Sequence, residues 1–298
     1  MSEIIRAEDP LVSVIIPSYN HAHYLGRALQ SVLDQTYTNW EAIVVDNHST
    51  DHTDKVIEGF AHPRIKCLKI NNNGVIGASR NLGIRAANGV WVAFLDSDDW
   101  WVNDKLLSCV QQINHEYDFV YHDLVIVGSS ARGIWKKLIK SWQVKCPVLL
   151  DLIENGNAIA TSSVLVRFEF LNRINGMNES LDMVAAEDYN AWLRIADLGA
   201  RFKYIPKALG FYQVHAESMS RKNMAIPIRS AVKEFLHRLN QKNLNQLEAE
   251  IKYLDSRFNI GVNPSMCMEK NLLFCMQFGR PSIKLKSMLI LGLKLLKR

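Results

Sequence analysis

An unbroken apolar run ends abruptly in three carboxylates in the stretch Val90-Trp91-Val92-Ala93-Phe94-Leu95-Asp96-Ser97-Asp98-Asp99. Six apolar residues without alternation predict a strand that is buried on both faces, as the strands of a parallel sheet are. In open α/β sheets, ligands bind in the crevice outside the carboxyl ends of the strands. The three acids therefore mark a candidate ligand site.

The carboxylates of Asp96, Asp98 and Asp99 suit a divalent cation. Acids packed this closely repel one another and raise each other's pKa, and a shared cation relieves that repulsion. Oxygen ligands without Cys or paired His favour Mg²⁺ or Mn²⁺, and Mg²⁺ commonly binds one or two carboxylates together with substrate phosphates. The competing interpretation is a solvated acidic turn, in which Asp98 or Asp99 caps a helix over 101–110.

The segment before this strand alternates between strands and helices. Apolar spacing predicts strands at 11–16, 42–45 and 65–70 and helices at 25–33, 56–60 and 79–87. Such a series builds right-handed βαβ units around a parallel sheet. The strand at 42–45 also ends in acids, at Asp46 to Asp51, so a second strand brings a carboxylate to the crevice.

Residues 1–110 are thus predicted to form a Rossmann-like, nucleotide-binding half, yet they lack the common phosphate-binding loops. Neither G-x-G-x-x-G nor G-x-x-x-x-G-K-[ST] follows any predicted strand. This argues against a dinucleotide dehydrogenase and a P-loop enzyme. Carboxylates and a cation must then hold the phosphates. The loop Asn71 to Gly74, rich in residues that tolerate positive φ, leads to Arg80 near the start of a helix.

The composition is that of a folded protein of 298 residues, with 48% hydrophobic and 22% charged residues. A net charge of +5 is too diffuse to indicate a nucleic-acid partner. The five cysteines lie far apart without a C-x-x-C motif, which favours a reducing compartment. Residues 1–10 do not resemble a signal peptide, and no run reaches the roughly 20 apolar residues that cross a bilayer. We therefore expect a cytoplasmic protein.

Residues 111–222 follow a different pattern and are expected to form the second half of the same domain. The predicted strands are 119–121, 124–127, 160–166, 201–205 and 208–214, and the predicted helices are 148–153, 168–174 and 187–196. A basic loop at 131–147 has two interpretations. It is either simply solvated, or it contacts an acceptor or headgroup through Trp135, Lys136, Lys137 and Trp142.

The helix at 187–196 begins with two acids. Its apolar residues recur at helical spacing and predict a buried stripe of Tyr189, Trp192, Leu193 and Ala196. Glu187 and Asp188 lie in the first turn, where the helix dipole stabilises anions, so capping alone can explain them. His215, after the last predicted strand, is likewise open to a structural or a ligand role.

The region 223–298 is predicted to be helical. Its tail, Pro281 to Arg298, carries five basic residues and no acid around a leucine-rich core. This composition is typical of a helix that lies in the interface of an anionic membrane. The alternative is a helix that docks on the rest of the protein. The first interpretation predicts a peripheral protein at the inner face of the plasma membrane.

Taken together, five motifs resemble those of the family 2 glycosyltransferases, which have the GT-A fold. They are Pro17-Ser18-Tyr19-Asn20, Asp46 to Asp51, Arg80-Asn81, Asp96 to Asp99 and Glu187-Asp188. The resemblance covers roughly 12–220. It implies a nucleotide-sugar donor, with a UDP-sugar favoured, a divalent metal (Mn or Mg) and inverting transfer by a single displacement.

The same resemblance suggests a role for each motif. Pro17, Tyr19, Asn20 and Asp46 match base and ribose contacts, and Arg80 lies close to the nucleotide. Asp96 and Asp98 match the acids that bind donor and metal, and His215 matches a later His that completes the metal shell or touches the diphosphate. Asp188 matches the catalytic base, and Glu187 a residue that orients the acceptor or the base.

The leading interpretation is an enzyme that builds a bacterial surface polysaccharide on a glycan or polyprenyl-linked acceptor. Asn47-His48, where the family often has a second Asp, leaves the nucleobase open. Two alternatives remain at this point. One is a metal-dependent nucleotidyltransferase, and the other is a non-catalytic module that binds a sugar nucleotide or glycan.

Overall fold

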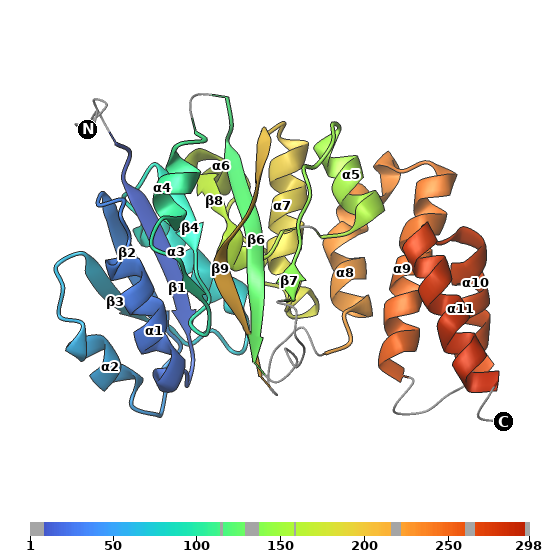
Figure 1. Cartoon of the computed structure of the whole chain (residues 1–298), viewed down its shortest axis with the longest axis horizontal. Coiled ribbons are helices and arrows are strands. Elements are labelled where there is room, and N and C mark those ends of the chain that lie inside the picture. The colour runs from blue at the N-terminus through green and yellow to red at the C-terminus, as the bar shows by residue number, and fades with distance from the viewer. Residues whose placement is uncertain are drawn as a thin grey trace.

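The computed structural model describes residues 9–113, 116–128, 137–157, 159–215, 222–259 and 266–295. In this part of the chain one mixed sheet forms the centre of the molecule, with the strand order β3-β2-β1-β4-β8-β6-β9-β5 and with β7 beside β6 (Figure 1). The strands are β1 (Val12–Ser18), β2 (Trp40–Asp46), β3 (Ile65–Lys69), β4 (Trp91–Phe94), β5 (Trp100–Trp101), β6 (Phe119–Gly128), β7 (Leu138–Ile139), β8 (Leu165–Arg167) and β9 (Phe202–Val214).

The first four strands are parallel, which confirms the predicted βαβ arrangement. β8 is antiparallel to both β4 and β6, and β6 and β9 are parallel to each other. The register of β1 and β2 pairs Ser18 with Asp46. The carboxyl ends of neighbouring strands therefore meet at one edge of the sheet, as the sequence predicts.

Helices flank the sheet and also lie beyond it at one end of the molecule. They are α1 (Ala22–Leu33), α2 (Thr53–Gly59), α3 (Ile76–Ala86), α4 (Lys105–Val110), α5 (Val148–Asn155), α6 (Phe168–Arg173), α7 (Glu187–Asp197), α8 (Ala225–Val232), α9 (Gln241–Asn259), α10 (Met266–Phe278) and α11 (Pro281–Leu295). Short 3₁₀ turns occur at η1 (Thr161–Ser163), η2 (Leu181–Met183) and η4 (Lys233–Arg238). Figure 1 shows α9, α10 and α11 beyond α8, at the end of the molecule far from β3.

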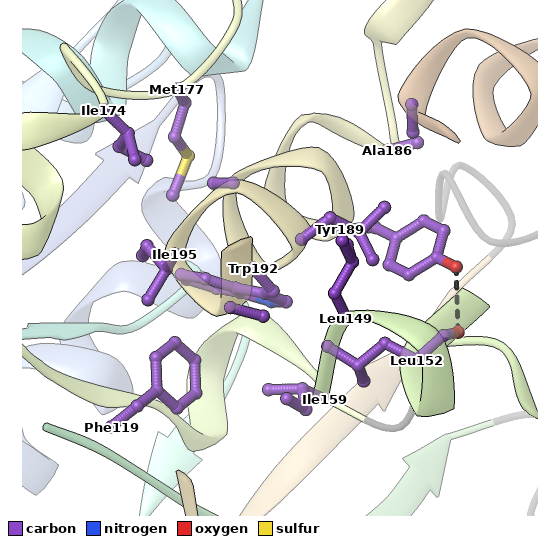
Figure 2. Packing of buried hydrophobic residues seen from close by; sticks show 14 of the residues in the cluster. Phe119, Leu149, Leu152, Ile159, Ile174, Met177, Ala186, Tyr189, Trp192 and Ile195 are labelled. Carbon is purple, nitrogen blue, oxygen red and sulfur yellow. Dashed lines mark hydrogen bonds between the residues drawn. The ribbon is translucent and has the colours of Figure 1, made fainter. Parts of the chain in front are cut away.

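Helix α7 is fixed by the stripe that the sequence predicts. Tyr189, Trp192 and Leu193 are buried in one cluster, and the Tyr189 hydroxyl donates to the Leu152 carbonyl at 3.0 Å (Figure 2). The Trp192 ring contacts Phe119 at a centroid distance of 4.9 Å. It also lies 6.0 Å from Phe94, the last residue of β4. This packing holds the start of α7 near the acids that follow β4.

The predicted helix over 101–110 is wrong at its beginning. Trp100 and Trp101 form β5 and pair with β9, while α4 begins only at Lys105. Asp104, rather than Asp98 or Asp99, precedes the helix. The capping interpretation of the acidic stretch is therefore wrong, because a strand pairing separates these acids from the helix.

Two pairs of predicted strands are in fact single strands. The segments 119–121 and 124–127 form β6, and the segments 201–205 and 208–214 form β9, which lies parallel to β6. The register shifts twice between His122 and Leu124, opposite Pro206 and its neighbours, and Pro206 has no N–H to donate to the ladder. This irregularity interrupts the apolar pattern and makes each strand look like two.

Two other boundaries also differ from expectation. The predicted strand at 160–166 begins as the turn η1, and only Leu165 onward is strand. Helix α3 begins at Ile76, so Arg80 lies in its second turn and not near its start. The predicted positive φ values in the loop before it are confirmed at Asn73 (51°) and Gly74 (82°).

The C-terminal helices dock on the domain. The Arg280 guanidinium donates to Glu250 at 2.6 Å and also to the Asn155 carbonyl at the end of α5. Ile283 of α11 is buried against α9 and α10. Across the described residues, every helix is too short or too polar to pass through a bilayer.

Candidate active site

Two cavities adjoin at the carboxyl edge of the sheet. The first has a volume of about 400 Å³ and the second about 590 Å³. Ile76, Asp96 and Tyr212 line both of them. Asp98 lines the first cavity and Asp188 the second. The acids predicted to bind the sugar donor and the candidate base therefore face neighbouring cavities that share a wall.

The first cavity collects most of the predicted nucleotide contacts. Pro17, Tyr19 and Asn20 line it, and the Tyr19 side chain is 54% exposed and available to stack on a base. Asn20 has a φ of 51°, and its side-chain oxygen accepts a hydrogen bond from the Thr50 backbone N–H at 2.8 Å. It therefore also ties together the loops that follow β1 and β2.

Asp46 does not line this cavity. Its carboxylate is buried, forms an ion pair with Lys69 at 2.8 Å and accepts hydrogen bonds from Ser49. The next residue, Asn47, lines the cavity in its place. In the structure Asp46 supports the loop that follows β2, and its contact with the nucleotide stays a prediction.

Asp96, Asp98 and His215 come together, as the resemblance implies. His215 Nε2 lies 3.0 Å from Asp98 Oδ2. Burial raises the pKa of Asp98, and the charge of Asp96 raises it further, against the opposing effects of His21 and His215. Burial together with the charges of Asp98 and Asp96 raises the pKa of Asp99 well above its usual range. The repulsion predicted from the sequence is thus present.

These side chains fit a divalent cation for which the protein supplies only some of the ligands. Within the described segments, no three His, Cys, Asp or Glu side chains are arranged as a complete metal-binding group. Two neighbouring carboxylates and one imidazole can coordinate Mg²⁺ or Mn²⁺ when phosphate oxygens supply the remaining ligands. The residues that would hold it are Asp98, Asp96 and His215.

His21 is a cavity residue that sequence reasoning missed. Its Nδ1 lies 2.8 Å from the Ser97 hydroxyl, and its ring centroid lies 5.8 Å from that of His215. It immediately precedes α1 and lines the first cavity. Its position directly after Asn20 is the signal that could have identified it.

Arg80 connects the two groups of acids. Its guanidinium donates to Asp96 at 2.6 Å and to Glu187 at 2.5 Å, and the side chain is buried. Burial disfavours the charged guanidinium, but the carboxylates of Asp96, Glu187 and Asp188 outweigh it and raise the pKa of Arg80. Arg80, which the resemblance places close to the nucleotide, thus pairs with carboxylates. These ion pairs fix β4 relative to α7.

Glu187 is buried, lines the second cavity and forms an ion pair with Arg80. The absence of a side chain at Gly77 lets the backbone of Asn178 approach closely, because a Cβ there would lie 2.8 Å from the Asn178 carbonyl oxygen. The role of Glu187 in orienting the acceptor or the base stays a prediction.

Asp188 lines the second cavity, together with Glu187, Asp96 and Asp99. Its Oδ2 accepts a hydrogen bond from the Thr161 hydroxyl at 2.6 Å, and its Oδ1 accepts one from the Tyr189 N–H at 2.6 Å. Burial, with the charge of Glu187, raises the pKa of Asp188 to about 6, although Arg80 and Thr161 favour the ionised form. A carboxylate with this pKa is ionised at neutral pH and still basic enough to accept a proton.

We expect the transfer rate to fall below about pH 6, because protonated Asp188 cannot accept a proton. The loss should approach about tenfold per pH unit in kcat/KM. Thr161→Val removes a hydrogen bond that favours the ionised form, so it should move the inflection to higher pH. Initial rates from pH 5 to 8 test this, and an inflection that Thr161→Val leaves in place would contradict it.

The described part of the predicted basic loop at 131–147 packs on the protein through Trp142 and lines the second cavity through Ile139. The Trp142 ring nitrogen lies 3.3 Å from the Asp151 carboxylate, and the Trp142 carbonyl accepts from the Tyr121 hydroxyl, so this residue packs. Trp135 and Lys136 lie outside the described residues, and Lys137 is exposed. Ile139 of β7, which follows, does line the second cavity.

Comparison with known proteins identifies the family. Residues 13–177, more than half of the chain, match the family described as glycosyl transferase family 2. The chain belongs to this family. The predictions of a glycosyltransferase and of the GT-A fold are confirmed, and the nucleotidyltransferase and non-catalytic alternatives are set aside.

The relatives of this glycosyltransferase include enzymes with named donors and acceptors. It is 31% identical over 221 residues to UDP-Glc:alpha-D-GlcNAc-diphosphoundecaprenol beta-1,3-glucosyltransferase WfaP of Escherichia coli, a match that covers 74% of this chain and 84% of WfaP. S. aureus TarS 1-349 in complex with UDP gives a TM-score of 0.66 at 22% identity, over 94% of this chain and 87% of that one. Mannosyltransferase PcManGT from Pyrobaculum calidifontis, in complex with GDP-Man and Mn²⁺, gives 0.61 at 19% identity, over 97% and 81%.

Proposed function

We propose that this glycosyltransferase inverts the anomeric carbon as it moves a sugar from a UDP-sugar to a hydroxyl of a glycan or lipid-linked acceptor in bacterial surface polysaccharide synthesis. The observation that carries the proposal is the wall shared by the two cavities. Residues predicted to bind the nucleotide-sugar donor line the first cavity, the candidate base Asp188 lines the second, and Asp96 lines both. The names of WfaP and TarS support a UDP-linked donor, and that of WfaP a lipid-linked acceptor.

In the proposed reaction the acceptor hydroxyl oxygen attacks C1 of the donor sugar. The bond from C1 to the diphosphate oxygen breaks, and the hydroxyl proton moves to Asp188. Arg80 keeps Asp96 and Glu187 in place, and Thr161 orients the Asp188 carboxylate. A divalent cation bound by Asp98, Asp96 and His215 would neutralise charge on the departing nucleoside diphosphate.

A panel of nucleotide sugars tests the function and its metal requirement. UDP-sugars with Mn²⁺ should raise the melting temperature, because a ligand that binds only the native state stabilises it. EDTA should remove most of that shift, and Asp98→Asn should reduce it. Release of nucleoside diphosphate in the presence of an acceptor supports a transferase. A shift that is equal with Mn²⁺ and with EDTA would contradict the metal assignment.

We also propose that the protein works at the inner face of the plasma membrane, with α11 against anionic lipid. Ile283 and Ser287 of α11 are buried, whereas Leu285, Met288 and Leu289 on its outer side are 60%, 53% and 59% exposed. The whole tail, 281–298, carries five basic residues and no acid. One face of the helix thus docks on the protein and the other offers apolar side chains beside positive charge.

Removal of 281–298 should shift the protein from anionic vesicles to the supernatant in a sedimentation assay. Leu285→Glu combined with Leu289→Glu should have the same effect while it leaves the docked face intact. Leu181→Glu, which changes another exposed leucine away from α11, should not. Unchanged sedimentation of the double variant would remove the membrane proposal without affecting the transferase proposal.

A further inference from the structure

Acids, apolar side chains and one residue of the C-terminal helices line the second cavity. Asp188 and Glu187 are two of the acids. The apolar side chains include Ile126, Ile139, Ile159, Val214 and Met224, which come from three strands, a loop and the residue before α8. Arg257, in the last turn of α9, is the contribution of the C-terminal helices to this wall.

Arg257 differs from the other arginine of the cavity. The guanidinium of Arg80 is engaged by Asp96 and Glu187. Arg257 is exposed, and its guanidinium forms no ion pair or hydrogen bond with the described parts of the chain. Its donors are therefore available to a ligand. An arginine fork matches the oxygens of a phosphate or diphosphate better than any neutral sugar group.

We propose that Arg257 binds the phosphate or diphosphate group through which an acceptor is linked to its lipid. The proposal rests on the proposed transferase function and names the acceptor class of that same site. An acceptor whose hydroxyl faces Asp188 would place its anionic linkage at Arg257, which lines the same cavity. The carboxylates of Asp188 and Glu187 repel an anion whereas Arg257 attracts one, so the charges also set the acceptor's direction.

Titration calorimetry with an alkyl diphosphate measures this contact without knowledge of the acceptor sugar. Saturating UDP and Mn²⁺ are present throughout, so that the donor cavity is occupied. Arg257→Ala should weaken alkyl diphosphate binding about tenfold, the change typical of losing a hydrogen bond to a charged group. Arg257→Lys should lie between, because it keeps the charge but loses the fork. Neither change should affect a neutral alkyl glycoside.

Lys242→Ala is the matched control, since it removes one positive charge from an exposed position on the same helix. It should leave the affinity unchanged. Equal affinity of the wild type and Arg257→Ala for the alkyl diphosphate would overturn the proposal. So would an equal loss for the diphosphate and the neutral glycoside, or a loss in Arg257→Ala of anionic-vesicle binding alone, which would assign Arg257 to a phospholipid headgroup. Failure of the transferase proposal would be seen separately, as no UDP release with any acceptor.

Discussion

Asp188→Asn should lower the transfer rate by a factor on the order of a hundred or more, while donor binding persists. Asparagine keeps the size of the side chain and can still accept a hydrogen bond from Thr161, which lies 2.6 Å from Asp188. It cannot take a proton from the acceptor hydroxyl. The kcat of transfer and the thermal shift by UDP with Mn²⁺ measure the two effects on one preparation.

Asp197→Asn is the control for this prediction, because it makes the same substitution at the other end of the same helix. Asp197 forms an ion pair with Arg238 and lines neither cavity. Its variant should transfer at the wild-type rate. Wild-type transfer by Asp188→Asn would show that another group accepts the proton.

Arg80→Met should destabilise the protein by about 3–5 kcal/mol, because it leaves the buried Glu187 carboxylate without its partner. Transfer should also fall steeply, since Asp96 and the start of α7 lose their common contact. Urea unfolding measures the free energy, and initial rates of the folded fraction at low temperature measure transfer.

A second substitution separates charge from position. Arg80→Met with Glu187→Leu removes both partners of the buried pair, so it should recover a large part of the lost stability. It should not recover transfer, because nothing then connects Asp96 to α7. A free energy of unfolding for Arg80→Met within about 1 kcal/mol of the wild type would contradict the bridging role.

The local features of the site could be predicted from the sequence. Acids after an apolar run indicate a strand end whatever the rest of the chain does, and the 3.6-residue spacing of Tyr189 and Trp192 predicts which side of α7 is buried. These periodicities depend only on near neighbours. For that reason β1, β2 and β4 end within two residues of their predicted ends, and the buried side of α7 agrees with the prediction.

Contacts between distant segments could not be predicted. Arg80 and Glu187 are 107 residues apart, and no local pattern distinguishes an arginine that binds a nucleotide from one that binds a carboxylate. The pairing of Trp101 with Gly210 on β9 likewise makes the beginning of an expected helix a strand, and the helix begins only at Lys105. Arg257 carries no motif at all, and only the docking of α9 brings it to the cavity.

The anomeric configuration of the product tests the central claim most directly. If Asp188 activates the acceptor for a single displacement, transfer from an α-linked UDP-sugar must give a β-glycoside. Proton NMR of the purified product reports the configuration of the new bond. A β-linked product is the result that this account predicts, and an α-linked product would contradict it.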